Sequence, residues 1–159
     1  MDVTIMLSIP SLLPRLSADF PNIRFVASDD FHWSPGDGTV YYHSKSTELA
    51  QLFHELSHAI LGHNDYSRDI NLLKMERDAW EQARELSEQY DLSVADDTIQ
   101  DHLDTYRAWL HDRSTCPDCT ATGMQTSEKS YRCVACGTNW RVNEAKTCQL
   151  LRYTTKTPA

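Results

Sequence analysis

The segment HELSHAILGH, residues 54–63, places two histidines four positions apart with a glutamate directly after the first. Side chains four apart in an α-helix stand one above the other, so His54 and His58 can face a single metal ion. Glu55 projects beside them, where a carboxylate can take a proton from a water held by that ion. The segment therefore predicts a metal site with a base next to it.

Two histidines leave a catalytic zinc site one protein ligand short, because such sites use three. The candidates are His63, Glu76 and Asp78. A third histidine in the pattern His-x-x-Gly-x-x-His would need glycine at 61 and histidine at 64, where the chain has Leu61 and Asn64. His63 instead suits the last turn of a helix, where a positive charge interacts favourably with the helix dipole.

Periodicity separates the two carboxylates. The apolar side of the segment after residue 68 consists of Leu72, Ala79, Ala83, Leu86 and Tyr90. Glu76 falls on this stripe, where a carboxylate is costly unless it is paired with a charge or bound to a metal. Asp78 lies on the charged, solvated side. Glu76 is the predicted third ligand, and a buried ion pair with an arginine is the alternative.

Four of the five cysteines form two Cys-x2-Cys pairs separated by thirteen residues: Cys116, Cys119, Cys133 and Cys136. Each pair turns two sulfurs toward a common point, and four thiolates complete a tetrahedral zinc site. Such a closed site has no open position for a substrate, so we expect a structural zinc; a redox dithiol is the alternative. Cys148 is left over, as a small buried residue or as a free thiol.

The cysteine-rich tail is too short to fold on apolar burial alone, which gives the metal a structural role. Residues 120–132 predict a β-hairpin, and residues 138–142 predict a third strand. A face with Tyr131, Arg132, Trp140 and Arg141 could bind nucleic acid or protein. A purely structural appendage is the equal alternative.

The elements that must position the first site are also readable. Residues 11–20 are weakly helical, with Pro14 tolerable only in a first turn. The other expected elements are a strand at 23–28, a hairpin at 31–43, and helices from Ser44 or Ser46 to Gly62, at 68–90 and at 96–111. We expect residues 39–42 to form an edge strand on which an extended peptide could lie. The segment 112–117 resembles a linker.

Charge divides the chain in the same place. The 159 residues carry a net charge of −8, with −11 in residues 1–113 and +3 in residues 114–159. We therefore expect two domains with these bounds. The overall charge argues against a protein that coats DNA or binds an anionic membrane. The chain has neither a readable signal peptide nor an apolar run long enough to span a bilayer, so we expect a cytoplasmic protein.

With these residues in place, the sequence resembles the gluzincin class of zinc metallopeptidases, and its "ERDAWEQA" run resembles the ImmA/IrrE-like branch. The resemblance covers roughly residues 20–92. In gluzincins the ligand glutamate often precedes a small residue by three, as Glu76 precedes Ala79. An aspartate commonly follows that ligand by four, but the residue here is Trp80. The orientation of the histidines must therefore come from another side chain.

The resemblance implies an α+β fold: a minimal zincin-like domain, with a small β-sheet packed on helices, followed by a small β zinc ribbon. We expect two zinc ions per chain, one of them catalytic and held by His54, His58 and Glu76. Zinc would lower the pKa of a water in the fourth position, and Glu55 would act as general base in peptide hydrolysis. The expected substrate is a specific intracellular protein or peptide. Tyr66, His102 and Tyr106 are candidates for stabilising the oxyanion.

Two alternatives stay open. A peptidase motif combined with a ribbon also resembles the SprT-like proteases that act on DNA-bound proteins, but these typically use a third histidine. The other alternative is a non-catalytic adaptor with one structural zinc in each half, which would have no use for Glu55 beyond packing.

Overall fold

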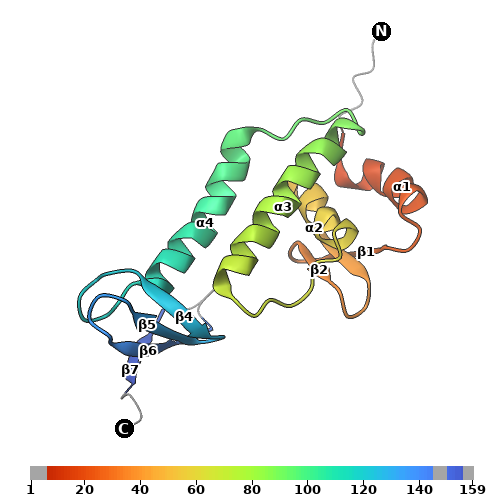
Figure 1. Ribbon diagram of the computed structural model, residues 1–159. Helices are drawn as coiled ribbons and strands as arrows, with labels where there is room; N and C mark the ends of the chain where they lie inside the picture. Colours follow the sequence, from red (N-terminus) through yellow and green to blue (C-terminus); the bar gives the residue numbers. More distant parts are fainter. Residues whose placement is uncertain (1–6, 145–149, 156–159) are drawn as a thin grey trace. The chain divides into compact units, whose positions relative to one another are not determined.

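The computed structural model describes residues 7–144 and 150–155, and Cys148 lies outside this range. The fold is α+β, as expected (Figure 1). The helices are α1 (Ile9–Asp19), α2 (Leu49–Ile60), α3 (Asp69–Glu88) and α4 (Asp96–Ser114). The strands are β1 (Arg24–Ser28), β2 (His32–Ser34), β3 (Thr39–His43), β4 (Gly123–Ser127), β5 (Ser130–Cys133), β6 (Asn139–Val142) and β7 (Arg152–Thr155).

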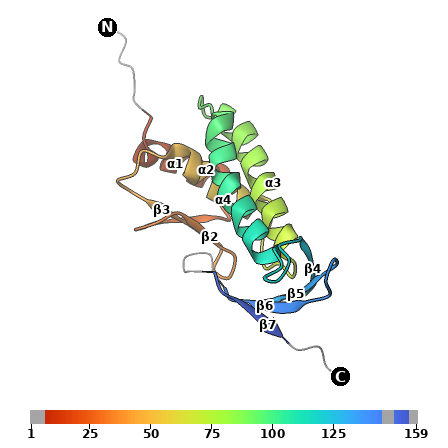
Figure 2. The same ribbon diagram turned by 90° about the vertical axis from the view of Figure 1, so that its left-hand side faces the viewer.

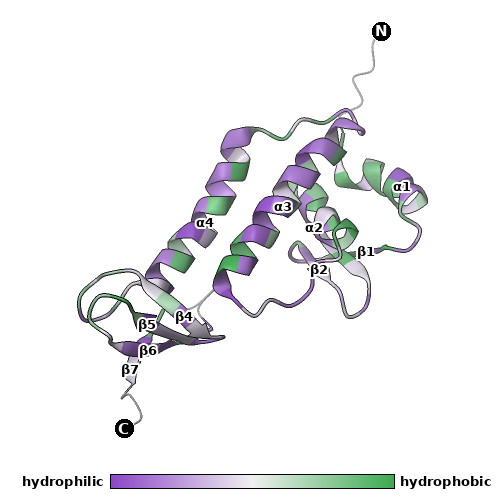
Figure 3. Ribbon diagram, in the orientation of Figure 1, coloured by the Kyte–Doolittle hydropathy of each residue, from purple (hydrophilic) through white to green (hydrophobic). Residues whose placement is uncertain are grey.

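The chain forms two compact units. Unit 1 is Met1–Asn64 with Arg77–Ala95, and unit 2 is Asp65–Glu76 with Asp96–Ala159. The division falls inside the continuous helix α3, directly after Glu76. Figure 3 shows hydrophobic and hydrophilic residues alternating along α3 and α4, which is typical of helices with one buried face. The domain boundary expected between residues 113 and 114 stays a prediction.

Unit 1 contains a three-stranded mixed sheet with the order β1-β3-β2. The predicted hairpin is confirmed, because β2 pairs with β3 in antiparallel fashion. Strand β1 pairs with the other side of β3 in parallel, with Arg24 opposite Thr39. The expectation that residues 39–42 form an edge strand is therefore wrong, since β3 is hydrogen-bonded on both sides. The edges of this sheet are β1 and β2.

Helix α2 packs against β2 and β3 (Figure 2). Its apolar side chains belong to the core of unit 1. Leu52, Phe53 and Leu56 are each fully buried. The helix starts later than expected: its N-cap is Glu48, whose backbone N–H donates to Ser46 Oγ at 3.1 Å. The helix ends just before Gly62, as predicted. The φ of Gly62 is +66°, a left-handed conformation that favours glycine.

Helix α1 is longer than the sequence suggested, because it begins at Ile9 with a capping box between Ser8 and Ser11. Pro14 consequently lies inside the helix rather than in its first turn. An interior proline costs about 3 kcal/mol, whereas each buried aliphatic side chain contributes about 1.5–3 kcal/mol. The buried residues of α1 are Ile9, Leu12 and Leu16, and their burial outweighs this cost.

Unit 2 contains a four-stranded antiparallel sheet with the order β4-β5-β6-β7. We call this sheet, with its two Cys-x2-Cys segments, the ribbon. The hairpin β4–β5 and the third strand β6 match the sequence prediction, and β7 is additional. The face predicted to bind partners is wrong in part: Tyr131 and Trp140 are buried and stack on each other, with ring centroids 5.5 Å apart. Arg132 and Arg141 are exposed.

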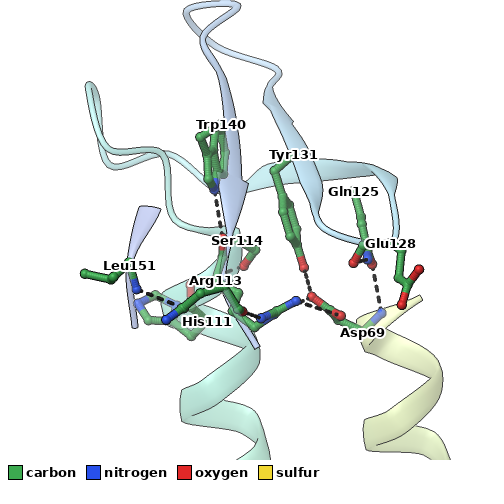
Figure 4. Close-up of polar contacts among 10 residues, drawn as sticks. Asp69, His111, Arg113, Ser114, Gln125, Glu128, Tyr131, Trp140 and Leu151 are labelled. Atoms are coloured by element: carbon green, nitrogen blue, oxygen red, sulfur yellow. Dashed lines mark hydrogen bonds and ion pairs between the residues drawn. The ribbon is translucent and has the colours of Figure 1, made fainter. Parts of the chain in front are cut away.

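The first half of the segment expected to be a linker, residues 112–114, is instead the end of α4, which continues to Ser114. Arg113 is buried, and its Nε lies 2.7 Å from Asp69 Oδ2 at the start of α3 (Figure 4). The Tyr131 hydroxyl donates to the same carboxylate, and the indole Nε1 of Trp140 donates to the Arg113 carbonyl at 3.0 Å. Gln125 Oε1 accepts from the Asp69 backbone N–H at 2.8 Å. Within unit 2, the ribbon is therefore joined to α4 and to the start of α3.

None of the described helices is both long enough and apolar enough to cross a membrane.

Candidate metal centres

The first site is built on α2. His54 and His58 are 4% and 8% exposed, and their Nε2 atoms lie 3.1 Å apart. Glu76 of α3 is 6% exposed, and ligand atoms of the three side chains all lie within 4.8 Å of one another. The structure thus brings together the three residues that spacing and periodicity had singled out. We call them the His-His-Glu group.

The two competing third ligands have other roles. Asp78 forms an ion pair with Arg77 at 2.6 Å, on the polar side of α3. His63 lies just beyond α2, and its Nδ1 contacts the Nδ1 of His58. The other ring nitrogen of His58, Nε2, faces His54. His63 does lie at the C-terminal end of α2, where its backbone N–H donates to the His58 carbonyl at 2.9 Å, and its side chain makes an additional contact with the site.

The ring of His54 is oriented by Trp80. The two rings stack with centroids 4.1 Å apart and an interplanar angle of 19°, and Trp80 is fully buried. This tryptophan stands where the resembled family has an aspartate. An indole face fixes the plane of an imidazole by contact alone, so it orients the ring without adding a charge.

The carboxylate of Glu55 is held by the neighbouring sheet. Its Oε2 accepts a hydrogen bond of 2.8 Å from the backbone N–H of Trp33 in β2. The indole Nε1 of the same tryptophan donates to the His63 carbonyl at 2.9 Å. Glu55 is half-buried, whereas both flanking positions of α2 are closed to solvent. Sequence reasoning missed Trp33, because nothing in its neighbourhood marks a strand N–H that faces a helix.

The donor set suits zinc. Two imidazole nitrogens and one carboxylate oxygen are the three-ligand combination that leaves an open position on a catalytic zinc. Without a cation, the two facing Nε2 atoms can share at most one hydrogen bond. A cation at this place would be bound by the lone pairs of both nitrogens. The geometry and chemistry of the residues therefore fit a zinc ion.

The second site is the four-cysteine group, Cys116, Cys119, Cys133 and Cys136, whose sulfurs also lie within 4.8 Å of one another. The Sγ atoms of Cys116 and Cys136 are 3.7 Å apart, and those of Cys119 and Cys133 are 3.4 Å apart. One cysteine of each pair is buried and the other is exposed. Four sulfurs gathered around one point match a closed tetrahedral site.

Backbone N–H groups of the second Cys-x2-Cys segment stabilise the thiolate form of Cys133. The N–H groups of Cys136 and Ala135 each donate to Cys133 Sγ at 3.4 Å, and these bonds lower the pKa of Cys133. Side-chain and backbone hydrogen bonds at Thr138 lower the pKa of Cys136 to about 6. Both thiols therefore favour the form that binds a metal.

The pKa of Cys119 shifts in the opposite direction. A backbone hydrogen bond at Ala121 favours its thiolate, but hydrogen bonds with the other sulfurs and desolvation outweigh it and raise the pKa of Cys119 to about 12. Four neighbouring sulfurs cannot all ionise without a cation, because like charges repel. The donor chemistry of this group therefore also fits a zinc ion.

Comparison with protein-family models, with curated proteins and with solved structures finds no match to this chain. The interpretation of the two groups therefore depends on their own donor atoms and surroundings. Among the described residues, the structure shows two candidate metal sites, the His-His-Glu group and the four-cysteine group.

Proposed function

We propose that the protein is a zinc metallopeptidase of the gluzincin type, with the His-His-Glu group holding the catalytic zinc. The observation that carries this proposal is a three-ligand donor set with a further acidic residue, Glu55, directly beside it in sequence. Glu76 is the ligand glutamate and Glu55 is the base. A structural zinc in the four-cysteine group brings the expected content to two ions per chain.

A bound zinc ion would polarise the scissile carbonyl and make a water acidic enough to lose a proton near neutral pH. Glu55 takes that proton and passes it to the leaving amine. The hydrogen bond that Glu55 accepts from the Trp33 N–H occupies one carboxylate oxygen and keeps the side chain at a defined place. The other oxygen of the carboxylate is the one assigned to the proton transfer.

The edge strand β2 gives a peptide substrate a place to bind. Trp33 pairs with Val40 of β3 on one side, and its N–H is directed at Glu55 rather than at β3. An extended peptide that adds to this edge would lie beside the base. This assigns to β2 the role that the sequence had suggested for β3. We propose a specific intracellular protein as the target.

The SprT-like alternative is less favoured, because the contact of His63 with His58 leaves the third-ligand position to Glu76. A nucleic-acid or protein partner of the ribbon would have to use exposed residues such as Arg132 and Arg141, since the aromatic pair is buried. Tyr66, His102 and Tyr106 stay candidates for oxyanion stabilisation.

The test compares wild type, Glu55→Gln and the control Glu81→Gln on the polar side of α3. Each zinc-loaded protein is incubated with a proteome-derived peptide library, and new termini are read by mass spectrometry. We expect two zinc ions in all three proteins and a loss of cleavage of about 10²–10⁴-fold only in Glu55→Gln. Equal cleavage by Glu55→Gln would refute the mechanism. Two zinc ions with no cleavage of any peptide would favour the adaptor.

A further inference from the structure

His63 stands outside the His-His-Glu group, yet its ring contacts one member of it directly. The Nδ1 atoms of His63 and His58 are 2.8 Å apart, with ring centroids 4.9 Å apart and an interplanar angle of 64°. We propose that His63 is a positioning residue that accepts the Nδ1–H of His58 and thereby keeps the Nε2 lone pair of His58 directed at the metal.

The proton count of a neutral imidazole determines which of its ring nitrogens can bind a metal. Such a ring carries one N–H, and only the other nitrogen can bind a metal. The Nε2 of His58 faces His54 Nε2 at 3.1 Å, in the group that would hold zinc, so its proton must sit on Nδ1. A proton on Nδ1 needs an acceptor, and His63 Nδ1 is at hydrogen-bonding distance. His63 then carries its own proton on Nε2.

The main chain holds His63 in place for this contact. Its N–H donates to the His58 carbonyl at 2.9 Å, immediately after the left-handed turn at Gly62. Its carbonyl accepts the Trp33 indole N–H at 2.9 Å. The backbone is therefore fixed on both sides of the residue, and the side chain is directed back onto His58.

Each of the two histidines of the His-His-Glu group has a partner that orients its ring. Outer partners of metal-bound histidines are usually carboxylates or carbonyls that accept the second ring N–H. Here Trp80 orients His54 by stacking, and His63 orients His58 by accepting a proton. Both devices are neutral, so they orient the two ligands without adding negative charge to that of Glu76.

The inference rests on the metal-binding part of the proposed function, but not on peptidase activity. The experiment compares wild type with two variants at one position. His63→Leu fills a similar volume without an acceptor, and His63→Gln restores an acceptor oxygen. His111→Leu, at an exposed position of α4, is the control.

The first readout is the zinc affinity of the His-His-Glu group, measured by competition with a chromogenic chelator. The zinc of the four-cysteine group serves as the internal reference. Loss of an outer partner typically lowers metal affinity by about 10–100-fold. We expect this loss in His63→Leu, recovery of most of it in His63→Gln, and no change in His111→Leu. Equal affinity of His63→Leu and wild type would overturn the proposal. So would a His63→Gln variant as weak as His63→Leu, because packing alone would then explain the effect.

The second readout is the tautomer of His58, from long-range ¹⁵N–¹H NMR spectra of protein that holds zinc in the four-cysteine group alone. We expect the proton on Nδ1 in wild type and in His63→Gln, and a shift toward Nε2 in His63→Leu. A proton on Nε2 in the wild type would overturn the inference. If wild type binds only the zinc of the four-cysteine group, the proposed function fails and the role of His63 fails with it. If wild type binds both zinc ions and shows no peptidase activity, the role of His63 stands while the peptidase proposal fails.

Discussion

The two candidate metal groups of this protein differ in how far apart in the chain their ligands lie. All ligands of the four-cysteine group come from residues 116–136, within or next to the strands of one small sheet. The ligands of the His-His-Glu group come from two helices, α2 and α3, and the contacts around them come from β2 and the turn after α2. The four-cysteine group has four sulfur donors and leaves no open position on a bound zinc ion. The His-His-Glu group has nitrogen and oxygen donors, and the candidate base Glu55 lies next to His54 in the sequence.

The cores around the two groups differ as well. The buried cluster of the ribbon consists of Cys116, Tyr131, Cys133, Trp140 and Val142. Two of these five residues are candidate metal ligands, so a metal bound there is part of that core. The apolar core of unit 1 includes aliphatic and aromatic side chains of α1 and α2 that bind no metal, among them Leu12, Leu16, Leu52, Phe53 and Leu56. We therefore expect a zinc ion in the four-cysteine group to be needed for folding, and one in the His-His-Glu group to be dispensable for it.

The largest effect should come from Cys133→Ser. Structural zinc contributes about 10–16 kcal/mol to small metal-dependent folds, so this change should unfold the ribbon and release one zinc. The indole N–H resonance of Trp140, which reports its bond to the Arg113 carbonyl, should lose its dispersion. His58→Ala should release the other zinc and leave that resonance unchanged. A dispersed Trp140 signal in Cys133→Ser would show that the ribbon folds without its metal, which contradicts the expected difference between the two groups.

The next largest effect should come from Asp69→Ala. The Asp69–Arg113 pair is 3% and 5% exposed, and removal of one partner of a buried pair costs about 3–5 kcal/mol. The measurement is urea unfolding of the zinc-loaded protein. Asp104→Ala is the control, because it breaks an exposed pair with Arg107 at 2.8 Å, and such pairs contribute at most about 1 kcal/mol. Similar losses in the two variants would show that burial does not matter here.

The ligand assignment is sharpened by Glu76→Gln and Asp78→Asn. Loss of a direct ligand should lower the affinity of the His-His-Glu group for zinc by more than the roughly 100-fold upper range of outer partners. Asp78→Asn should bind both zinc ions as wild type does, because Asp78 is paired with Arg77 on the polar side of α3. Chelator competition measures both. The reverse result would move the third ligand to Asp78.

The smallest effect should come from Tyr131→Phe. This change removes only the hydroxyl that donates to Asp69, and a hydrogen bond to a charged group contributes about 1.5–3 kcal/mol. We expect a lower unfolding midpoint in urea with both zinc ions retained. An unchanged midpoint would show that Arg113 alone satisfies the Asp69 carboxylate.

Spacing predicted the two histidines and the four cysteines, because a helix places residues four apart on one face and a Cys-x2-Cys turn brings two sulfurs together. Glu76 was found by helical periodicity, as a carboxylate on an apolar stripe. The failed expectations share a different cause. The central position of β3, the burial of Tyr131 and Trp140, and the pairing of Arg113 all depend on neighbours more than ten residues away in the chain.

The candidate metal ligands and the candidate base can be read from the sequence. Local geometry brings together the two histidines of α2 and the two cysteines of each Cys-x2-Cys pair, and Glu76 is marked by its place on an apolar helical stripe. Only the tertiary structure decided what orients them. By spacing alone His63 is a third ligand out of register, and the turn at Gly62 directs it onto Nδ1 of His58. Trp33 and Trp80 carry no motif, yet packing brings one to Glu55 and the other to His54. Hydrogen bonds and ring contacts between distant segments form only when the core closes.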